Sequence, residues 1–309
     1  MKRNHNHLIF QYISALTNKP TLKRFIGRLS INHKINIILD LEDSIQDIRN
    51  KANNSFLKSE ARTNLRNLLQ DKIDFNIGIR INQLTTDEFK KDIVFLEENI
   101  FFKWKYIVLP KVDDLIDIQE YLEVLKKIKY NEIIICIESQ KGLNNLKRIL
   151  SADLKGVSKI QFGHFDFFLD KGIFPIPNQD NFIFWEYCSK IISEIEVNGY
   201  TYLHSPINKL ESNFVLSVLN YLSNRCKNEF GFATVSVAQS EILYKNIIEE
   251  VKPLKIIKEQ RSKRLYAVQI VRYFETSKKK NISFMSNSKN KRFIPPQEYF
   301  SAIKYLSSK

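Results

Sequence analysis

The sequence predicts an α/β protein in which eight strand–helix units close into a (β/α)8 TIM barrel, followed by a C-terminal helical extension. Short apolar runs recur along the chain, and each is followed by a longer polar segment with helical periodicity. The runs are almost continuously apolar, which is typical of parallel strands that are buried on both faces. Eight such units fit within residues 1–251, and a barrel of this kind usually takes about 250 residues.

Strands and helices are expected to alternate along the whole barrel. The predicted strands are residues 8–14, 35–42, 75–82, 106–112, 132–139, 159–167, 200–206 and 232–239. The predicted helices are residues 22–29, 44–69, 86–98, 115–129, 143–150, 182–197, 210–227 and 240–251. Residues 252–309 are expected to form an appendage or lid, with a helix over 262–279 and a short helix after Pro295 and Pro296.

An open, doubly wound sheet is the alternative fold. It usually has fewer strands and a glycine-rich first turn. This chain has only 8 Gly residues, and it contains neither G-x-G-x-x-G nor G-x-x-x-x-G-K. Glycine-rich loops that bind dinucleotides or nucleotide phosphates are therefore excluded.

The composition limits the partners and the compartment. The net charge is +14, but the basic residues are spread along the chain, which favours a solvated surface over a face that binds nucleic acid. The 3 Cys residues lack C-x-x-C spacing, which argues against a disulfide framework or a zinc site and fits a reducing compartment. No apolar run approaches the roughly 20 residues of a membrane span. A cytoplasmic protein with no membrane partner is expected.

Polar residues stand at the carboxyl ends of the predicted strands, where such barrels place their chemistry. They are Asp40, Glu42, Asp43 and Ser44 after the second strand, Arg80 and Asn82 in the third, Lys111 in the fourth, Glu138 in the fifth, and His164 and Asp166 in the sixth.

Glu138 and Asp166 are one strand–helix unit apart, so they should end neighbouring strands. Two converging carboxylates repel each other unless a cation lies between them. The pair therefore predicts a Mg²⁺ or Mn²⁺ site that water and substrate complete. Rim carboxylates that form salt bridges with Lys111 or Arg80 are the alternative that the spacing leaves open.

Arg80 ends an apolar strand, where a guanidinium is costly unless it meets an anion. Its two-pronged geometry fits a carboxylate, which predicts binding of a carboxylate-bearing substrate. Pairing with Glu42 or Asp43 is the alternative. Glu42, Asp43 and Lys111 are also assigned to substrate binding, although the two acids are equally suited to orienting metal-bound water.

Three further groups are candidates for covalent or acid–base chemistry. Lys111 is the residue for a Schiff base, but nothing nearby is arranged to lower its pKa. His164 and His204 also end strands and are candidate acids or bases, with a purely structural role as the alternative.

Six short segments follow one another in a characteristic order and spacing. They are 38–44 (ILDLEDS), Lys58 with Ala61 and Arg62, 80–82 (RIN), 109–112 (LPKV), 137–139 (IES) with Gly142 and Leu143, and Gly163 with Asp166. In this series the chain resembles the HpcH/HpaI aldolase and citrate lyase beta-subunit family of metal-dependent carbon–carbon lyases. The resemblance runs from about residue 30 to 170, and more weakly through Gly231 and Phe232 to the segment at Pro295 and Pro296.

The resemblance implies a TIM barrel in which Glu138 and Asp166 bind Mg²⁺ and Arg80 binds the carboxylate or oxo group of the substrate. It also implies a homo-oligomer, a trimer or a hexamer. Members cleave or form a bond between an acetyl-CoA-type or pyruvate-type enolate and a carbonyl compound. The metal polarises a carbonyl and stabilises the enolate without a covalent intermediate.

Three departures from the family pattern concern CoA binding and acid–base chemistry rather than the metal site. Residues 4–7 (NHNH) replace paired arginines, and residues 237–239 (VAQ) replace an Ile-His-Pro. Phe293 and Ile294 stand where thioester-handling members carry an aspartate that acts across a subunit boundary. The reaction would then either need no such group, as in retro-aldol cleavage of an oxo-acid, or take an acid or base from His164, His204 or Glu298.

The sequence therefore predicts a divalent-metal-dependent lyase or aldolase that acts on an oxo- or hydroxy-acid or its CoA thioester. A catalytically silent barrel that binds a small carboxylate is the alternative, and a basic protein that binds polyanions is a third. The presence of Arg80, Glu138 and Asp166 together favours the enzyme.

Overall fold

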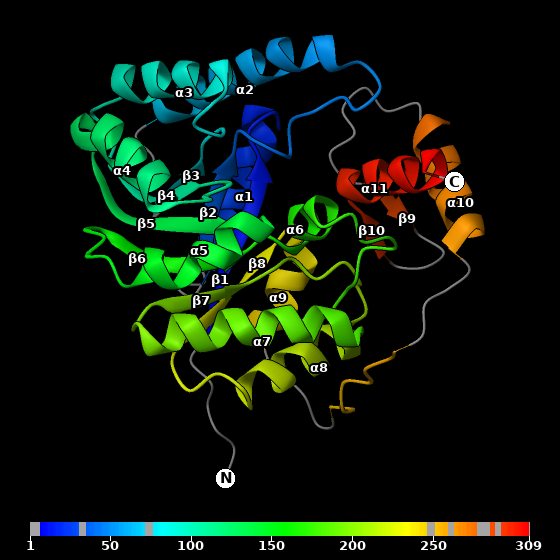
Figure 1. Ribbon diagram of the computed structural model, residues 1–309. Coiled ribbons are helices and arrows are strands. Elements are labelled where there is room, and N and C mark those ends of the chain that lie inside the picture. Colours follow the sequence, from blue (N-terminus) through cyan, green and yellow to red (C-terminus); the bar gives the residue numbers. More distant parts are fainter. Residues whose placement is uncertain are drawn as a thin grey trace.

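The computed structural model describes residues 7–30, 35–71, 77–245, 251–258, 263–276, 285–287 and 292–308. Eight parallel strands close into a barrel in sequence order, with helices packed around it (Figure 1). The predicted (β/α)8 barrel is confirmed. No helix in these ranges is long and apolar enough to cross a membrane.

The barrel strands are β1 (His7–Ser14), β2 (Ile35–Asp40), β3 (Ile77–Arg80), β4 (Trp104–Leu109), β5 (Tyr130–Ile137), β6 (Val157–Phe162), β7 (Thr201–His204) and β8 (Phe230–Thr234). The helices that follow them are α1 (Lys19–Ser30), α2 (Asn54–Leu69), α3 (Asp87–Glu98), α4 (Leu115–Val124), α5 (Gln140–Leu150), α6 (His164–Asp170) and α7 (Phe182–Val197), α8 (Ser212–Ser223) and α9 (Val237–Lys245). Short 3-10 turns, Lys51–Asn53 and Leu125–Lys127, precede α2 and follow α4.

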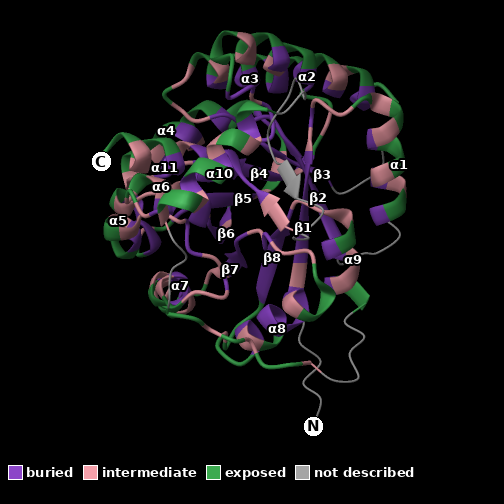
Figure 2. Ribbon diagram, turned by 90° about the vertical axis from the view of Figure 1, so that its right-hand side faces the viewer, coloured by how far each residue is buried: buried purple, intermediate pink, exposed green. Residues whose placement is uncertain are grey.

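The apolar runs of the sequence are explained by two buried layers. Strand residues alternate between the barrel interior and the layer beneath the helices. Phe10 and Ile134 belong to the interior cluster, whereas Ile9 and Ile133 belong to the larger cluster beneath the helices. Figure 2 shows the strands buried at the centre and the exposed residues on the outer helices. Both faces of each strand are covered, so no polar alternation is seen in the sequence.

The C-terminal part packs at the end of the barrel where the strands finish. It contains α10 (Lys263–Glu275), an antiparallel pair of β9 (Met285–Asn287) and β10 (Arg292–Ile294), and α11 (Pro296–Ser307). Its own apolar cluster includes Ala267, Phe274 and Tyr299, together with Ile48 and Phe174 from barrel loops. In Figure 1, α11 lies beside α6, and the two helices are in contact.

Several predicted boundaries are wrong, for local reasons. The strand predicted over 159–167 ends at Phe162, and after Gly163 the aromatic run continues as α6 with Phe167 and Phe168 buried. The strand predicted over 232–239 ends at Thr234, and α9 begins at Val237. Residues 75–76, 246–250, 262 and 277–279 of predicted elements lie outside the described residues.

The helix predicted from residue 44 begins only at Asn54. The carboxylate of Asp40 accepts hydrogen bonds from the backbone N–H groups of Glu42 and Ser44, and Asp47 accepts one from Arg49. Side-chain oxygens that bind nearby backbone N–H groups compete with helix formation. The chain after β2 is therefore a loop.

Candidate active site

A cavity of about 220 Å³ lies at the C-terminal end of the barrel. Its lining includes four carboxylates, Asp40, Asp43, Glu138 and Asp166, and one guanidinium, Arg80. Four of the six predicted site residues, Asp43, Arg80, Glu138 and Asp166, therefore line one cavity where the strands end, as expected for this fold. The other two, Glu42 and Lys111, are not part of this lining but form ion pairs with Arg80 and Asp166, respectively.

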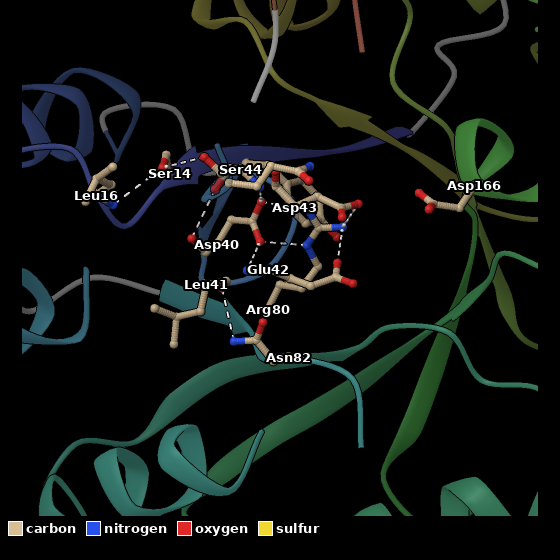
Figure 3. A network of polar contacts seen from close by, with 12 residues as sticks. Ser14, Leu16, Asp40, Leu41, Glu42, Asp43, Ser44, Arg80, Asn82 and Asp166 are labelled. Atoms are coloured by element: carbon tan, nitrogen blue, oxygen red, sulfur yellow. Dashed lines mark hydrogen bonds and ion pairs between the residues drawn. The ribbon is translucent and has the colours of Figure 1, made fainter. Parts of the chain in front are cut away.

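Arg80, the last residue of β3, is held by Asp40, the last residue of β2. Nε donates to Oδ1 at 2.7 Å and Nη2 donates to Oδ2 at 2.6 Å. Burial would raise the pKa of Asp40, but Arg80 and the backbone hydrogen bonds hold it below its ordinary value. The pair is thus a fixed, ionised part of the cavity wall (Figure 3).

The remaining edge of Arg80 faces the other acids of the β2–α2 loop. Nη1 lies 3.0 Å from Oε2 of Glu42 and 3.6 Å from Oδ2 of Asp43. The alternative pairing with Glu42 and Asp43 is therefore present, but the two-pronged contact is made with Asp40. Any role of Arg80 in substrate binding has to use the Nη1 side.

Glu138 follows β5 and Asp166 lies in the first turn of α6. Oε2 of Glu138 accepts a hydrogen bond from the backbone N–H of Lys111 at 3.1 Å. Burial, with repulsion from Glu42 and Asp166, raises the pKa of Glu138 well above its ordinary range. Burial and Asp43 raise the pKa of Asp166 to about 7. Figure 3 shows Asp166 on the side of the site opposite Arg80 and its partners.

Lys111 lies between the two groups of acids. Its Nζ is 3.8 Å from Oε1 of Glu42 and 3.8 Å from Oδ1 of Asp166. Glu42 above all raises the pKa of Lys111 above its ordinary value, although burial opposes this. A protonated ammonium is a poor nucleophile, so the environment of Lys111 does not favour a Schiff base.

The charges of the site fit a divalent cation. Among the described residues, four carboxylates, Asp40, Glu42, Asp43 and Asp166, share two cations, Arg80 and Lys111, in ion pairs. Within the same residues the fifth carboxylate, Glu138, accepts a hydrogen bond only from the backbone N–H of Lys111. Burial and Asp43 also raise the pKa of Glu42 to about 7, which reflects the excess of negative charge. A cation between Glu138 and Asp166 would relieve this repulsion.

Within the described ranges, no group of three or more His, Cys, Asp or Glu side chains is placed to hold a metal ion. Two carboxylates could therefore supply only part of the coordination shell, with water and substrate oxygens as the remainder. This is how proteins commonly hold Mg²⁺, which keeps several of its waters.

Gly163 makes room for Glu138. A Cβ atom at Gly163 would lie 2.4 Å from both Cγ and Oε1 of Glu138. Only a residue without a side chain allows Glu138 to lie across the end of β6.

His164, His204 and Glu298 are the candidates for an acid or base. Of these three, only His164 lines the cavity. It is buried, and neither ring nitrogen has a hydrogen-bond partner of good geometry among the described residues. Burial and His204 lower its pKa well below the ordinary value. Nδ1 of His204 is 3.0 Å from the Tyr202 hydroxyl, and neither residue lines the cavity. Glu298 is held by Arg292 at 2.6 and 2.9 Å.

The cavity lining also includes polar residues to which the sequence pattern assigned no site role, among them Tyr12, Asp40, Gln161 and Gln297. Asp40 carried a usable signal, because it ends an apolar strand as Arg80 does. Tyr12 and Gln161 lie within apolar strands, and Gln297 lies in the C-terminal extension. Their position in the site follows only from the closed barrel and from the packing of α11.

These features define a (β/α)8 barrel with a carboxylate-rich mouth. The profile of the HpcH/HpaI aldolase/citrate lyase family matches residues 24–209, which is more than half of the chain, so the chain belongs to this family. Membership makes it a relative of carbon–carbon lyases. No curated protein sequence matches it significantly.

Solved structures share the fold at low sequence identity. A Haloferax volcanii malate synthase, solved as a pyruvate/acetyl-CoA ternary complex, is 12% identical with a TM-score of 0.68, over 100% of this chain and 92% of that one. A citrate lyase beta subunit from M. tuberculosis, complexed with oxaloacetate and magnesium, is 17% identical with a TM-score of 0.59, over 78% and 96%. The Mycobacterium tuberculosis protein CitE, in complex with magnesium, acetoacetate and coenzyme A, is 15% identical with a TM-score of 0.58, over 97% of each chain.

Proposed function

We propose that this chain is a divalent-metal-dependent carbon–carbon lyase that acts on an oxo- or hydroxy-acid or its CoA thioester. Glu138 and Asp166 would hold Mg²⁺ or Mn²⁺. The observation that carries this proposal is the buried excess of carboxylates around Arg80 and Lys111. Family membership and the magnesium, oxaloacetate and acetoacetate bound in the similar structures support it.

When bound, the metal would polarise the substrate carbonyl and stabilise the enolate that forms as the carbon–carbon bond breaks. The chain's own residues supply the rest. Lys111 and the Nη1 edge of Arg80 carry the positive charge that would attract a substrate carboxylate. Asp40 keeps Arg80 in place, so little side-chain entropy is lost when the substrate binds.

The C-terminal segment influences which substrate we expect. Phe293 and Ile294 bring no acid or base, and Glu298 is committed to Arg292. Cleavage of a pyruvate-type acid by retro-aldol chemistry should therefore be easier to detect than condensation of acetyl-CoA with glyoxylate.

The test begins with metal binding measured by calorimetry. The wild type should bind Mg²⁺ or Mn²⁺, and the double variant Glu138→Gln, Asp166→Asn should not. Glu132→Gln is the matched control, because Glu132 lies in the same strand and pairs with the buried Lys159 away from the cavity. Equal metal binding by the wild type and the double variant would refute the assigned ligands.

The second step uses pyruvate in D₂O, since exchange of its methyl protons reports enolate formation without a second substrate. Exchange should require the metal and should be lost in the double variant. Metal and pyruvate binding without exchange, and without cleavage of oxaloacetate, would instead identify a barrel that binds a small carboxylate but has no lyase activity.

A further inference from the structure

Tyr12 and Gln161 form a hydrogen-bonded pair across the barrel interior. Tyr12 belongs to β1 and Gln161 to β6, two strands that are not neighbours in the barrel. The Tyr12 hydroxyl donates to Oε1 of Gln161 at 2.6 Å, and both residues line the cavity. The pair therefore forms part of the cavity floor.

This bond fixes the orientation of the Gln161 amide. Because Oε1 accepts from Tyr12, the NH₂ group is on the other side of the carboxamide. Gln161 is 4% exposed, and no residue in the described parts of the chain accepts a hydrogen bond from its Nε2. A donor without a protein acceptor, on a residue that lines the cavity, is suited to an acceptor on a ligand.

The same floor also contacts Arg80. The guanidinium carbon of Arg80 is 5.3 Å from the centre of the Tyr12 ring, within range of a cation–π interaction. The two-pronged edge of Arg80 is used by Asp40, so Arg80 cannot offer its strongest contact to a ligand. Gln161 lines the same cavity as Glu138 and Asp166. The other amide in this lining, Gln297, already donates to Asp166, so Gln161 is the amide whose N–H groups have no acceptor among the described residues.

We propose that Nε2 of Gln161, held in orientation by Tyr12, donates a hydrogen bond to a carboxylate or oxo oxygen of the bound substrate and so helps to select small oxo-acids. This inference rests on the proposed function and names a specificity-determining residue for it. The substrate oxygen would lie between the Gln161 amide and the two candidate metal ligands.

Affinity for oxaloacetate in the presence of Mg²⁺ tests the proposal. Gln161→Met removes the donor and nearly keeps the volume, so oxaloacetate should bind about 10- to 100-fold more weakly, as expected for a lost hydrogen bond to a charged group. Metal affinity should stay within about twofold, because Gln161 is not an assigned ligand. If Gln161→Met fails to fold, Gln161→Asn withdraws the amide by one methylene and gives the same comparison.

Two tyrosine variants separate the role of Tyr12 from loosening of the barrel. Tyr12→Phe frees the amide to rotate and should weaken oxaloacetate binding, though less than Gln161→Met. Tyr106→Phe is the matched control: its hydroxyl donates to Oδ1 of Asn36 at 3.2 Å inside the same barrel, but neither residue lines the cavity. Tyr106→Phe should lower the free energy of unfolding by a similar amount without changing the affinity for oxaloacetate. An equal loss of affinity in Tyr106→Phe and Tyr12→Phe would mean that the Tyr12 hydroxyl affects binding only by stabilising the barrel.

A charge test checks which end of the amide faces the substrate. Gln161→Glu places an acceptor against an anionic oxygen, so oxaloacetate binding should be lost. Retained binding would show that an oxygen faces the ligand and would overturn the proposal.

Two outcomes distinguish failure of this inference from failure of the proposed function. If the wild type and Gln161→Met bind oxaloacetate equally, only this inference fails. If the metal-loaded wild type binds no oxo-acid, the proposed function fails and this inference fails with it.

Discussion

At the scale of single residues, Gly163 is a position of the site where there is no room for a side chain. A methyl group there would collide with Cγ and Oε1 of Glu138 at 2.4 Å. We expect Gly163→Ala to displace Glu138 and to weaken metal binding about tenfold or more, as for other disturbed ligand positions. Overpacking should also lower the free energy of unfolding by about 1–3 kcal/mol. Calorimetry with Mg²⁺ and chemical denaturation measure the two effects.

Gly27 provides the control for this substitution. It lies in α1, and nothing is within 4 Å of where its Cβ would be. Gly27→Ala should leave metal binding unchanged and should stabilise the protein by about 0.5–1 kcal/mol, because alanine favours the helix. Unchanged metal affinity in Gly163→Ala would show that Glu138 is not a ligand.

Arg80 combines a structural contact with the contact to substrate that we propose, and Arg80→Lys tests both. A lysine cannot make the two parallel bonds to Asp40, so the free energy of unfolding should fall by about 1–3 kcal/mol. Oxaloacetate affinity should fall as well. Asp40→Asn is the companion variant, because it weakens the same pair but keeps the guanidinium. Equal losses of affinity in the two variants would assign Arg80 a structural role alone.

At the scale of elements, α11 reaches the site of its own chain through Gln297. Its Nε2 donates to Oδ2 of Asp166 at 2.7 Å and lies 3.4 Å from Oδ2 of Asp43. Residues that hydrogen-bond to a metal-binding carboxylate usually affect metal affinity about 10- to 100-fold. We therefore expect Gln297→Leu to weaken Mg²⁺ binding by about tenfold, measured by calorimetry.

Ser301→Ala is the matched control for the α11 contact. The Ser301 hydroxyl also links α11 to the loop after α6, donating to the carbonyl of Ile173 at 3.2 Å, but it contacts no carboxylate of the site. This variant should keep full metal affinity. A similar loss in Ser301→Ala and Gln297→Leu would mean that only the docking of α11 matters, and not the Gln297 amide.

The β6–α6 region shows what sequence patterns can and cannot specify. The run through Phe165, Phe167 and Phe168 has strong strand propensity, so the sequence predicts one long strand over 159–167. In the structure Gly163 interrupts that run, and the phenylalanines become the buried face of α6. Local propensity is ambiguous for short aromatic runs, and tertiary packing decides between helix and strand.

The sequence predicts most of the charged residues of the site but not its neutral residues Tyr12, Gln161 and Gln297. Arg80, Glu138 and Asp166 are charged residues next to apolar strands, so the barrel rule alone brings them to one mouth. Tyr12 and Gln161 have no such signal, because an interior position close to the mouth depends on strand register in the closed barrel. Gln297 is far from the other residues in the sequence, and its contact depends on how α10 and α11 pack on the barrel.

At the scale of the whole molecule, two buried carboxyl groups and a buried histidine change the free energy of unfolding in opposite directions as the pH falls. Glu42 and Asp166 have a pKa raised to about 7 by burial and by neighbouring acids, so the native state binds their protons more readily than the unfolded chain. These groups favour the metal-free native state as the pH falls from about 7 towards 4. Burial lowers the pKa of His204 to about 3, which has the opposite effect.

The contribution of His204 can be isolated by comparing the wild type with His204→Gln, which can still bond to the Tyr202 hydroxyl. In the unfolded chain His204 takes up a proton below about pH 6.5, whereas the native state stays neutral until about pH 3. The stability of the wild type relative to the variant should therefore be constant above pH 6.5. It should fall by about 1.4 kcal/mol per pH unit below that, because the unfolded state then binds more protons. Denaturant unfolding of the metal-free proteins from pH 7.5 to 4.5 measures the difference, and a constant or rising difference at low pH would show that His204 is protonated in the native protein.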